Sequence, residues 1–149
     1  GELSIQPVPV PHDAREPIQF VFRHRSRAFG VLTDLGSVTP RIVEAFDGVD
    51  ALLLECNHDP ALLAQGPYPP SLRARVGGPF GHLANAQAAQ LLGAIDHARL
   101  RHLVAGHLSE QNNHPDLARA ALENVAEGID ERLSLLMQDA ISGWFDILD

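Results

Sequence analysis

Side chains that can bind metal ions follow several of the strands that this sequence predicts. They are Asp34, Glu55, His58 and His107, each soon after an apolar segment, and His12, ahead of the first predicted hairpin. In open α/β folds the carboxyl ends of the strands form the ligand-binding crevice, so side chains far apart in the sequence can meet there. Imidazole and carboxylate together suit zinc or manganese, so the pattern indicates a metal site.

Each of these residues also has a simpler structural interpretation. Asp34 precedes a leucine and a glycine, which is typical of a turn residue that accepts backbone hydrogen bonds. His58, His82 and His107 each fit a loop histidine or a helix cap. Their shared position favours the metal site, because buried polar groups need partners and a metal ion supplies several at once.

The composition predicts one globular domain over residues 1–149, since 45% hydrophobic residues at this length supply one ordinary core. The single cysteine, Cys56, excludes an internal disulfide and cannot by itself form a thiolate metal site. A formal charge of −8 argues against a uniformly basic surface that coats nucleic acid. No apolar run in the sequence approaches the roughly 20 residues that span a bilayer, so we expect no membrane partner and a cytoplasmic location.

The elements that must position these side chains alternate between strands and helices after a β-rich start. Strands over 19–22 and 29–33 suggest a hairpin, and Pro7, Pro9 and Pro11 favour an edge strand or a loop before it. The other predicted elements are a helix over 40–46, a strand over 51–54, a loop-rich segment over 57–81, a helix over 84–98, a strand over 101–105, a helix over 115–127 and a last amphipathic helix over 129–141. This alternation predicts an α/β layered fold.

Five motifs taken together resemble a known family. They are HDA at 12–14, VLTDLG at 31–36, LLLECNHD at 52–59, YPPSLRARVGGPFGHLAN at 68–85 and HLSEQNN at 107–113. In this order they resemble the second half of a metallo-β-lactamase-fold hydrolase, in the branch of YycJ-like metal-dependent hydrolases that is also similar to ribonuclease Z. The resemblance implies an α/β fold class, as the C-terminal half of a four-layer αββα metallo-β-lactamase fold.

The resemblance also implies roles for individual residues around two divalent metal ions, zinc or manganese. His12 would complete one metal site, Asp34 would bridge the two ions, and His107 would bind the second ion. The candidate catalytic residues beside Asp34 are His58 and His82, as a proton donor to the leaving group or as a phosphate contact.

The surroundings of these ligands are implied in the same way. Glu55 would line the same pocket, and Ser109 with its neighbouring asparagines would fix the loop behind His107 by hydrogen bonds. The candidate substrate-binding residues are Arg73, Arg75, Asn112 and Asn113. The two arginines are candidates to hold a phosphate, and the alternative for them is a solvated basic turn.

One part of the family pattern is missing from the sequence. Hydrolases of this kind take most of their metal ligands from an H-x-H-x-D-H signature in the first half, and no such string occurs in these 149 residues. Three ligands split between two ions leave each ion about two protein donors, whereas a zinc site needs roughly three or four. We therefore interpret the chain as a fragment and expect partial or no metal occupancy, and slow turnover or none by the chain alone.

A missing half also predicts exposed apolar surface, and with it self-association as a homo-oligomer through the exposed sheet face. A second copy would cover that face, or the last residues would, since Trp144, Phe145, Ile147 and Leu148 need burial. The simpler expectation is a C-terminal helix and tail over 130–149 that packs on its own domain.

For the intact protein the resemblance implies a water activated by two metal ions that attacks a phosphodiester. The implied substrate is nucleic acid or another phosphodiester, cleaved as an exonuclease would cleave it. Two other functions stay open. The first is a non-catalytic interaction or structural module of the same fold, in which the histidines are only hydrogen-bonded. The second is a thioester or lactone hydrolase, which the same fold supports with other pockets.

Overall fold

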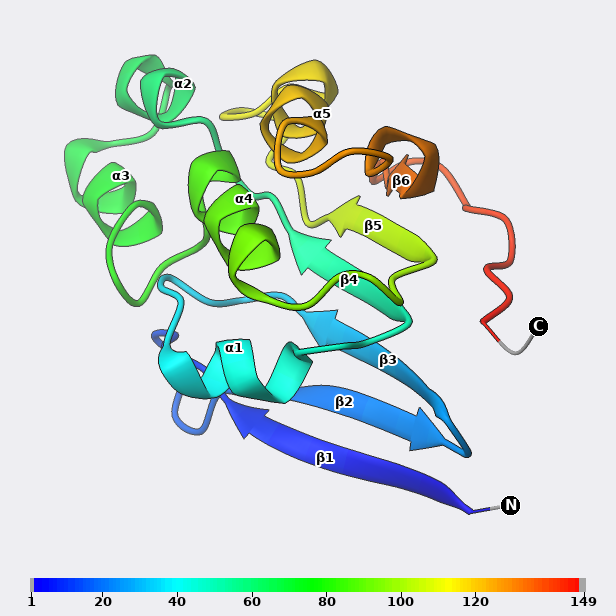
Figure 1. Ribbon diagram of the computed structural model, residues 1–149. Helices are drawn as coiled ribbons and strands as arrows, with labels where there is room; N and C mark the ends of the chain where they lie inside the picture. Colours follow the sequence, from blue (N-terminus) through cyan, green and yellow to red (C-terminus); the bar gives the residue numbers. More distant parts are fainter. Residues whose placement is uncertain (1, 148–149) are drawn as a thin grey trace.

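The computed structural model describes residues 2–147 and has the α/β fold that the sequence predicts. The strands of this part are β1 Leu3–Pro9, β2 Ile18–His24, β3 Arg27–Leu32, β4 Ala51–Glu55, β5 His102–Gly106 and β6 Leu133–Leu135. Its helices are α1 Pro40–Phe46, α2 Pro60–Gln65, α3 Pro70–Val76, α4 Asn85–Ala94, α5 Pro115–Glu123 and the 3-10 helix η1 Asp130–Arg132. Figure 1 shows α1 and α4 lying across one face of the sheet, with α2 and α3 gathered beyond the end of β4.

The six strands of the described chain form one sheet in their sequence order, with β1 at one edge and β6 at the other. β1, β2 and β3 pair antiparallel, which confirms the predicted hairpin, and β3 to β6 pair parallel. β1 is an edge strand, in line with its prolines. Pro7 and Pro9 have no N–H to donate, and an edge strand leaves one side of its backbone unpaired.

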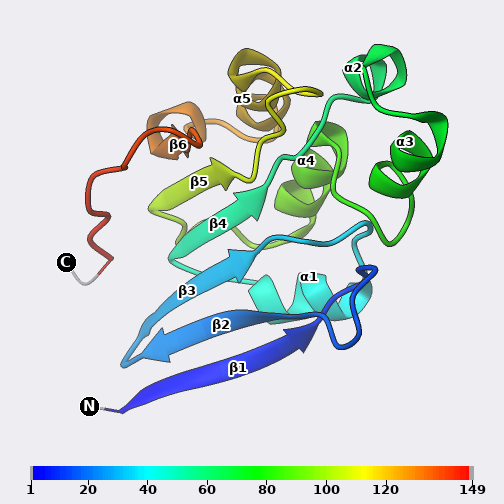
Figure 2. The ribbon, with the colours of Figure 1, turned by 180° about the vertical axis from the view of Figure 1, so that it is seen from behind.

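The two faces of the sheet differ in what covers them. Val21, Leu32 and Leu54 point to the face beneath the helices, where they are fully buried in the core. The opposite face carries apolar side chains that are only partly buried, and Figure 2 shows no helix across it. These side chains are Phe20, Phe22, Phe29, Val31 and Leu53. The described chain therefore has one helical layer and one sheet with a bare apolar face.

Prolines begin most of the helices. α1 begins at Pro40, the start of the predicted helix over 40–46, and the side chain of Thr39 before it accepts a hydrogen bond from the Ile42 N–H. The sequence predicts a loop-rich segment over 57–81, and this prediction is wrong in part because α2 and α3 lie within it. Both begin at a proline, whose fixed φ suits the first helical position, and Asp59 caps α2 through two backbone N–H groups.

The predicted C-terminal helix over 129–141 is wrong. After η1 the chain forms β6, in which Leu133 pairs with Leu103 of β5, and Leu136 N–H donates to Ala105 O at 2.9 Å. Pairing with the open edge of β5 satisfies the backbone groups that a helix would have satisfied internally. Gly128, with φ of 76°, separates this strand segment from the helical segment before it.

The C-terminal tail after β6 has no regular secondary structure up to residue 147, and Leu148 lies outside the described residues. The ring of Phe145 lies 5.5 Å from the ring of His102 on β5, while the Trp144 side chain is fully exposed. Together with the sheet, the tail bounds an apolar groove whose floor includes Leu53 and Val104. The tail therefore borders the bare face of the sheet instead of packing as a helix.

Helices α4 and α5 end earlier than the sequence pattern suggests. α4 ends at Ala94, after which the Asp96 N–H donates to the Asp47 carboxylate at 2.6 Å, a contact that fixes the chain in a turn.

Among residues 2–147, none of the helices is both long enough and apolar enough to cross a bilayer.

Candidate metal centre

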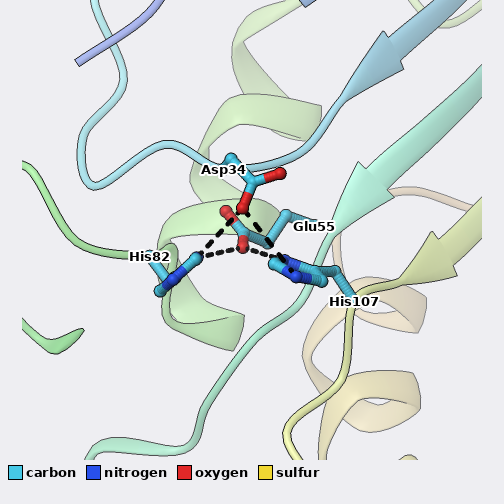
Figure 3. A group of neighbouring side chains, drawn as sticks. All are labelled: Asp34, Glu55, His82 and His107. Atoms are coloured by element: carbon cyan, nitrogen blue, oxygen red, sulfur yellow. Dashed lines mark hydrogen bonds and ion pairs between the residues drawn. The ribbon is translucent and has the colours of Figure 1, made fainter. Parts of the chain in front are cut away.

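Polar side chains converge at the carboxyl ends of the parallel strands β3, β4 and β5 (Figure 3). Asp34 lies two residues after β3, Glu55 ends β4, and His107 directly follows β5. His82 reaches the same point from the loop before α4. The register that pairs Glu55 with Gly106 aligns the ends of β4 and β5, so residues that are distant in the sequence meet.

Three histidines surround Asp34. Its Oδ1 lies 3.9 Å from His12 Nε2, 3.9 Å from His82 Nδ1 and 3.8 Å from His107 Nε2. The rings of His12 and His107 each lie 5.1 Å, centroid to centroid, from the ring of His82. The three residues on which the predicted metal centre depends, His12, Asp34 and His107, are therefore neighbours in the structure.

Two of these residues have a backbone conformation that L-amino acids rarely adopt. The φ angle is 55° at Asp34 and 57° at His107, in the left-handed region that favours glycine. Such a conformation costs roughly 1–3 kcal/mol and persists only where the surrounding structure over-determines it. Strained residues of this kind cluster at functional sites, and here both lie in the same group of polar side chains.

The loop that carries Asp34 packs closely against the loop that carries His82. The Gly36 N–H donates to Pro11 O at 2.8 Å. A Cβ at Gly36 would lie 2.4 Å from Gly81 N, closer than real contacts allow. Glycine at position 36 therefore lets the two loops approach, and this approach brings Asp34 next to His82.

Glu55 is a fully buried carboxylate that holds two of the histidines in place. Its Oε1 accepts hydrogen bonds from His82 Nδ1 at 2.7 Å and from His107 Nδ1 at 2.6 Å. Its Oε2 accepts from the backbone N–H groups of Leu35 at 3.1 Å and Leu83 at 3.3 Å. Burial raises the pKa of Glu55, but the hydrogen bonds from His107 and His82 outweigh it and bring the pKa to about 2. The carboxylate is therefore charged at neutral pH.

The three histidines all use Nδ1 for a hydrogen bond within the protein. His12 Nδ1 donates to Gly81 O at 2.9 Å, and His82 and His107 donate to Glu55. Donation from Nδ1 fixes the neutral tautomer in which Nε2 carries the lone pair. The hydrogen bond to Glu55 also raises the pKa of His107, against the opposing effect of burial. The rings are thus oriented before any ligand binds.

This donor set fits a divalent cation. Ligand atoms about 2.1 Å from one ion lie about 3–4 Å from one another, which matches the separations of His12 Nε2 and His107 Nε2 from Asp34 Oδ1. In the described chain, Asp34, Glu55, His82 and His107 each offer a ligand atom within 4.8 Å of the others. A carboxylate that accepts from the far nitrogen of a ligand histidine is the usual support of metal-binding imidazoles.

A cleft of about 260 Å³ gives access to this group from solvent. His82 and His107 form one side of it, and Tyr68, Glu110 and Gln138 lie on its other walls. The two histidines that Glu55 orients are therefore within reach of a substrate.

His58 lies apart from that cleft. Its side chain lines a second pocket together with Arg73 and Gly77, and the residue is only 3% exposed. Burial lowers the pKa of His58, so its ring is neutral at neutral pH. The catalytic role suggested for His58 stays a prediction, and its pocket is a different one from the cleft beside His82.

The two candidate phosphate-binding arginines lie on α3 and have different surroundings. Arg75 Nε forms an ion pair with the carboxylate of Asp13, which lowers the pKa of Asp13 and raises that of Arg75 through this hydrogen bond. Asp13 Oδ1 in turn lies 3.6 Å from His12 Nε2. Arg73 instead donates to Ala64 O of α2. Substrate binding by either arginine stays a prediction.

The two candidate asparagines support the loop behind His107. Asn112 is fully buried, and its Nδ2 and N–H groups both donate to Ser109 Oγ at 3.2 Å. Asn113 Nδ2 donates to Cys56 O at 2.7 Å and to Asn85 Oδ1 at 2.9 Å. These contacts fit the loop-fixing role expected from the sequence, and the expected contact of the asparagines with substrate stays a prediction.

The shared hydrogen bonds of Glu55 are the feature that sequence reasoning missed. Glu55 was expected to line the pocket, but its function as the common acceptor for His82 and His107 was not foreseen. The available signal was the acidic residue at the end of the apolar strand Ala51–Glu55, where an unpaired buried charge would be costly.

Comparison with known proteins gives matches along most of the chain. The family described as "Beta-lactamase superfamily domain" matches residues 1–107. Exodeoxyribonuclease YycJ of Bacillus anthracis is 33% identical over 127 residues, which are 85% of this chain and 48% of that protein. Exodeoxyribonuclease WalJ of Streptococcus pneumoniae serotype 2 is 33% identical over 124 residues, 83% of this chain and 46% of that protein. The chain thus spans about half the length of these curated relatives.

Solved structures share the fold. The metallo-beta-lactamase fold protein YhfI from Bacillus subtilis has a TM-score of 0.64 at 16% identity, over 91% of this chain and 47% of that one. Zn(2+)-bound PqqB from Methylobacterium extorquens has a TM-score of 0.52 at 17% identity, over 90% of this chain and 47% of that one. At these identities the likeness concerns the fold alone.

Proposed function

The chain belongs to the beta-lactamase superfamily, and from that membership we propose that it forms part of a metal-dependent hydrolase that cleaves phosphodiester bonds of DNA as an exonuclease. The observation that supports this proposal most directly is the group around Asp34. Its Oδ1 lies within 3.9 Å of one nitrogen of each of three histidine rings. Two of these rings, those of His82 and His107, also donate to the buried carboxylate of Glu55. No simple structural role requires three histidines around one partly exposed carboxylate.

The residues divide into metal ligands and a proton carrier. We assign His12, Asp34 and His107 as the residues that would hold divalent ions, zinc or manganese, with Asp34 as the carboxylate that both histidines approach. Such ions supply an activated water and stabilise negative charge on the phosphodiester oxygens. The protein contributes the orientation of these ligands through Glu55 and Gly81, which accept from the Nδ1 atoms of His107 and His12.

His82 is the proposed proton donor to the leaving oxygen. Its Nδ1 is bonded to Glu55 and its ring borders the cleft, so Nε2 is the ring atom that can meet a substrate. Because Glu55 accepts from Nδ1, a proton that His82 passes to the substrate would leave from Nε2. A single oxygen atom of Glu55 thus orients both His107, the proposed ligand, and His82, the proposed acid.

We propose that these 149 residues supply only part of the complete metal centre. Three protein ligands shared by two ions are fewer than stable zinc sites use. The curated relatives are about twice as long as the matched region, and one face of the sheet is bare and apolar. In this proposal the chain is the C-terminal half of the domain, and polypeptide outside it adds ligands and covers the bare face. Activity of the chain alone is then low or absent.

DNA is the proposed substrate because both curated relatives are named exodeoxyribonucleases. A chain with a net charge of −8 does not bind DNA through a uniformly basic surface, so recognition has to occur at the metal centre and at local arginines. Arg75 is suited to this because it lies beside His12 through Asp13. A DNA substrate would also suit a cytoplasmic location.

The test is hydrolysis of end-labelled single-stranded and double-stranded DNA in the presence of Zn²⁺ or Mn²⁺. The protein is expressed with any polypeptide that its reading frame encodes upstream, and Asp34→Ala and His82→Ala are compared with His97→Ala. His97 is a suitable control because it lies before β5, at the opposite end of the sheet from the cluster. Loss of stepwise cleavage in the first two variants, with the control active, supports the proposal. Cleavage that survives Asp34→Ala, or cleavage of a thioester or lactone but not of DNA, contradicts it.

A further inference from the structure

A second pocket lies behind the helix that borders the metal-centre cleft. It has a volume of about 540 Å³, within the range of small-molecule sites. α3 separates it from the cleft, because Val76 lines the cleft while Arg73 and Gly77 line the pocket. Leu63 of α2 and the first turn of α4 form its other walls. Figure 1 shows α2 and α3 beyond the end of β4, next to α4.

The deepest polar group of this pocket is His58. The residue is 3% exposed, and its Nδ1 is buried without a hydrogen bond partner among residues 2–147. Its Nε2 faces Gly77 on the pocket wall, where a Cβ would lie 4.0 Å away. Buried polar atoms are normally hydrogen-bonded, so the unpaired Nδ1 of this ring indicates a missing polar partner.

The charge of the pocket indicates what that partner is. Arg73 supplies a guanidinium whose contact within the described chain is the carbonyl oxygen of Ala64, and none of the lining residues is acidic. In the first turn of α4 the Asn85 N–H donates to His58 O and the Gln87 N–H to Ala84 O, so the Ala86 N–H, together with the positive end of the helix dipole, is what this turn offers to the pocket wall. The chain as a whole carries a net charge of −8, so a pocket with an arginine and no acidic lining residue differs from the rest of the molecule. Such a pocket favours an anion.

We propose that this pocket binds the phosphate group of a nucleotide, with Arg73, His58 and the first turn of α4 as the phosphate contacts. The apolar walls formed by Pro60 and Leu63 suit the remainder of the nucleotide. The identity of the ligand rests on the proposed function, because an exonuclease releases nucleoside monophosphates and holds a phosphorylated strand. The anion site itself rests on the pocket.

The experiment titrates dAMP, inorganic phosphate and deoxyadenosine into the chain with chelator present, followed by amide and imidazole NMR shifts. We expect saturable binding of dAMP, with shifts at His58 and Ala86, and much weaker binding of deoxyadenosine. Arg73→Met is expected to weaken dAMP binding by roughly tenfold or more, because it removes a charged hydrogen bond. Arg119→Met, which changes an arginine paired with Glu123 on α5, should have no effect. Equal binding of dAMP and deoxyadenosine, or unchanged binding in Arg73→Met, overturns the proposal.

His58→Gln provides a second variant in case the loss of Arg73 disturbs α2 and α3. It should weaken dAMP binding while the thermal melting of the protein stays cooperative, and unchanged affinity in such a folded variant also overturns the proposal.

An oligonucleotide with a 5′-phosphate distinguishes the source of the phosphate: tighter binding than dAMP assigns the pocket to a strand end, and weaker binding assigns it to a free mononucleotide. The titration needs no metal, so it tests the anion site independently of the nuclease. Binding of dAMP without DNA cleavage would support the anion site and contradict the proposed nuclease function. DNA cleavage without dAMP binding would support the nuclease function and contradict the anion site.

Discussion

At the scale of single residues, Glu55 connects the parts of the candidate metal centre. One oxygen atom accepts from both His82 and His107, and the other accepts two backbone N–H groups. A fully buried carboxylate is costly unless such partners are present, so the four hydrogen bonds also explain why the charge is tolerated at the end of β4. Orientation of the site and stability of the strand end therefore depend on the same side chain.

Replacing Glu55 tests this role. Glu55→Gln should lower the affinity for Zn²⁺ or Mn²⁺ by about 10–100-fold, the usual effect of losing the hydrogen bond behind a ligand histidine. Competition with a chromogenic chelator measures the affinity. Glu44→Gln on α1 is the matched control, because Glu44 is exposed and lies outside the cluster. Equal affinities of the two variants would show that Glu55 does not orient the ligands.

The same hydrogen bonds predict how the stability of the metal-free chain depends on pH. The folded-state pKa of Glu55 is lowered from 4.5 to about 2, so its contribution is present above pH 4.5 and is lost as the pH falls toward 2. The pKa of His107 is raised above 6.5, so its contribution is present below pH 6.5 and is lost as the pH rises through the folded-state value. Urea unfolding in chelator should therefore show highest stability between these limits.

Glu55→Gln should flatten that pH profile at both ends, because the glutamine neither titrates nor raises the pKa of His107. The comparison is made on the difference between wild type and variant, so that other titrating groups cancel. A difference that stays constant between pH 3 and pH 8 would contradict the assignment of the pH dependence to this pair.

The sequence was sufficient to predict which candidate metal ligands lie close together, but not which groups hold them in place. His12, Asp34 and His107 could be placed at one edge because two of them follow parallel strands and the motifs fix their order. The separation of His58 from the cleft could not be predicted, since it depends on the short helix α3 lying between the two. Glu55 supports the histidines of the cleft from its buried position, while His58, three positions later, lines the other pocket.

At the scale of secondary structure elements, the positions of the site residues depend on close packing between sheet and helices. β3 passes beneath α1 at Gly30, where a Cβ would lie 2.6 Å from Phe46 Cδ1. Phe46 is fully buried at the end of α1. The strand that leads to Asp34 can therefore lie this close to the helix only because residue 30 has no side chain.

Gly30→Ala should destabilise the protein by about 1–3 kcal/mol, the usual cost of adding a methyl group to a well-packed core. Gly93→Ala on α4 is the opposite control: its Cβ would lie 3.5 Å from Val125 Cγ1, an ordinary contact, so better helix propensity should add about 0.5–1 kcal/mol. Chemical denaturation measures both. A neutral Gly30→Ala would mean that α1 can move away from β3 without cost.

Most elements could be predicted from hydrophobic pattern and helix-start signals, and the errors have identifiable causes. The prolines of the segment 57–81 are compatible with both loops and helix starts, and the sequence does not decide between them. The apolar spacing around Leu133 fits an amphipathic helix, but β5 offers an open parallel edge that only the tertiary structure creates. In both cases a partner distant in sequence determines the local structure.

At the scale of the whole molecule, the sheet separates a covered face from a bare one. The helical layer buries one face, while Phe20, Phe22 and Phe29 on the other are only partly covered, and Ile5 is 52% exposed. A contiguous apolar surface on a sheet favours association with another surface. We propose that copies of this chain associate through the bare face when nothing else covers it.

Placing a charge in this face should reduce self-association several-fold. Ile5 and Phe22 are paired neighbours on β1 and β2, so Ile5→Lys and Phe22→Lys can be tested singly and together. Leu117→Lys is the control, because it changes a 41% exposed leucine on α5, away from this face. Sedimentation velocity over a range of concentrations gives the association state. A wild-type chain that stays monomeric at all concentrations would reject this proposal.

Metal binding to the chain itself tests the central claim most directly. Calorimetric titration with Zn²⁺ and with Mn²⁺ should show saturable, weak binding that Asp34→Asn and His107→Ala each lower by at least about tenfold, while His97→Ala binds as wild type does. Binding of the same strength in wild type and in both cluster variants would contradict the account, because the ions would then be held elsewhere.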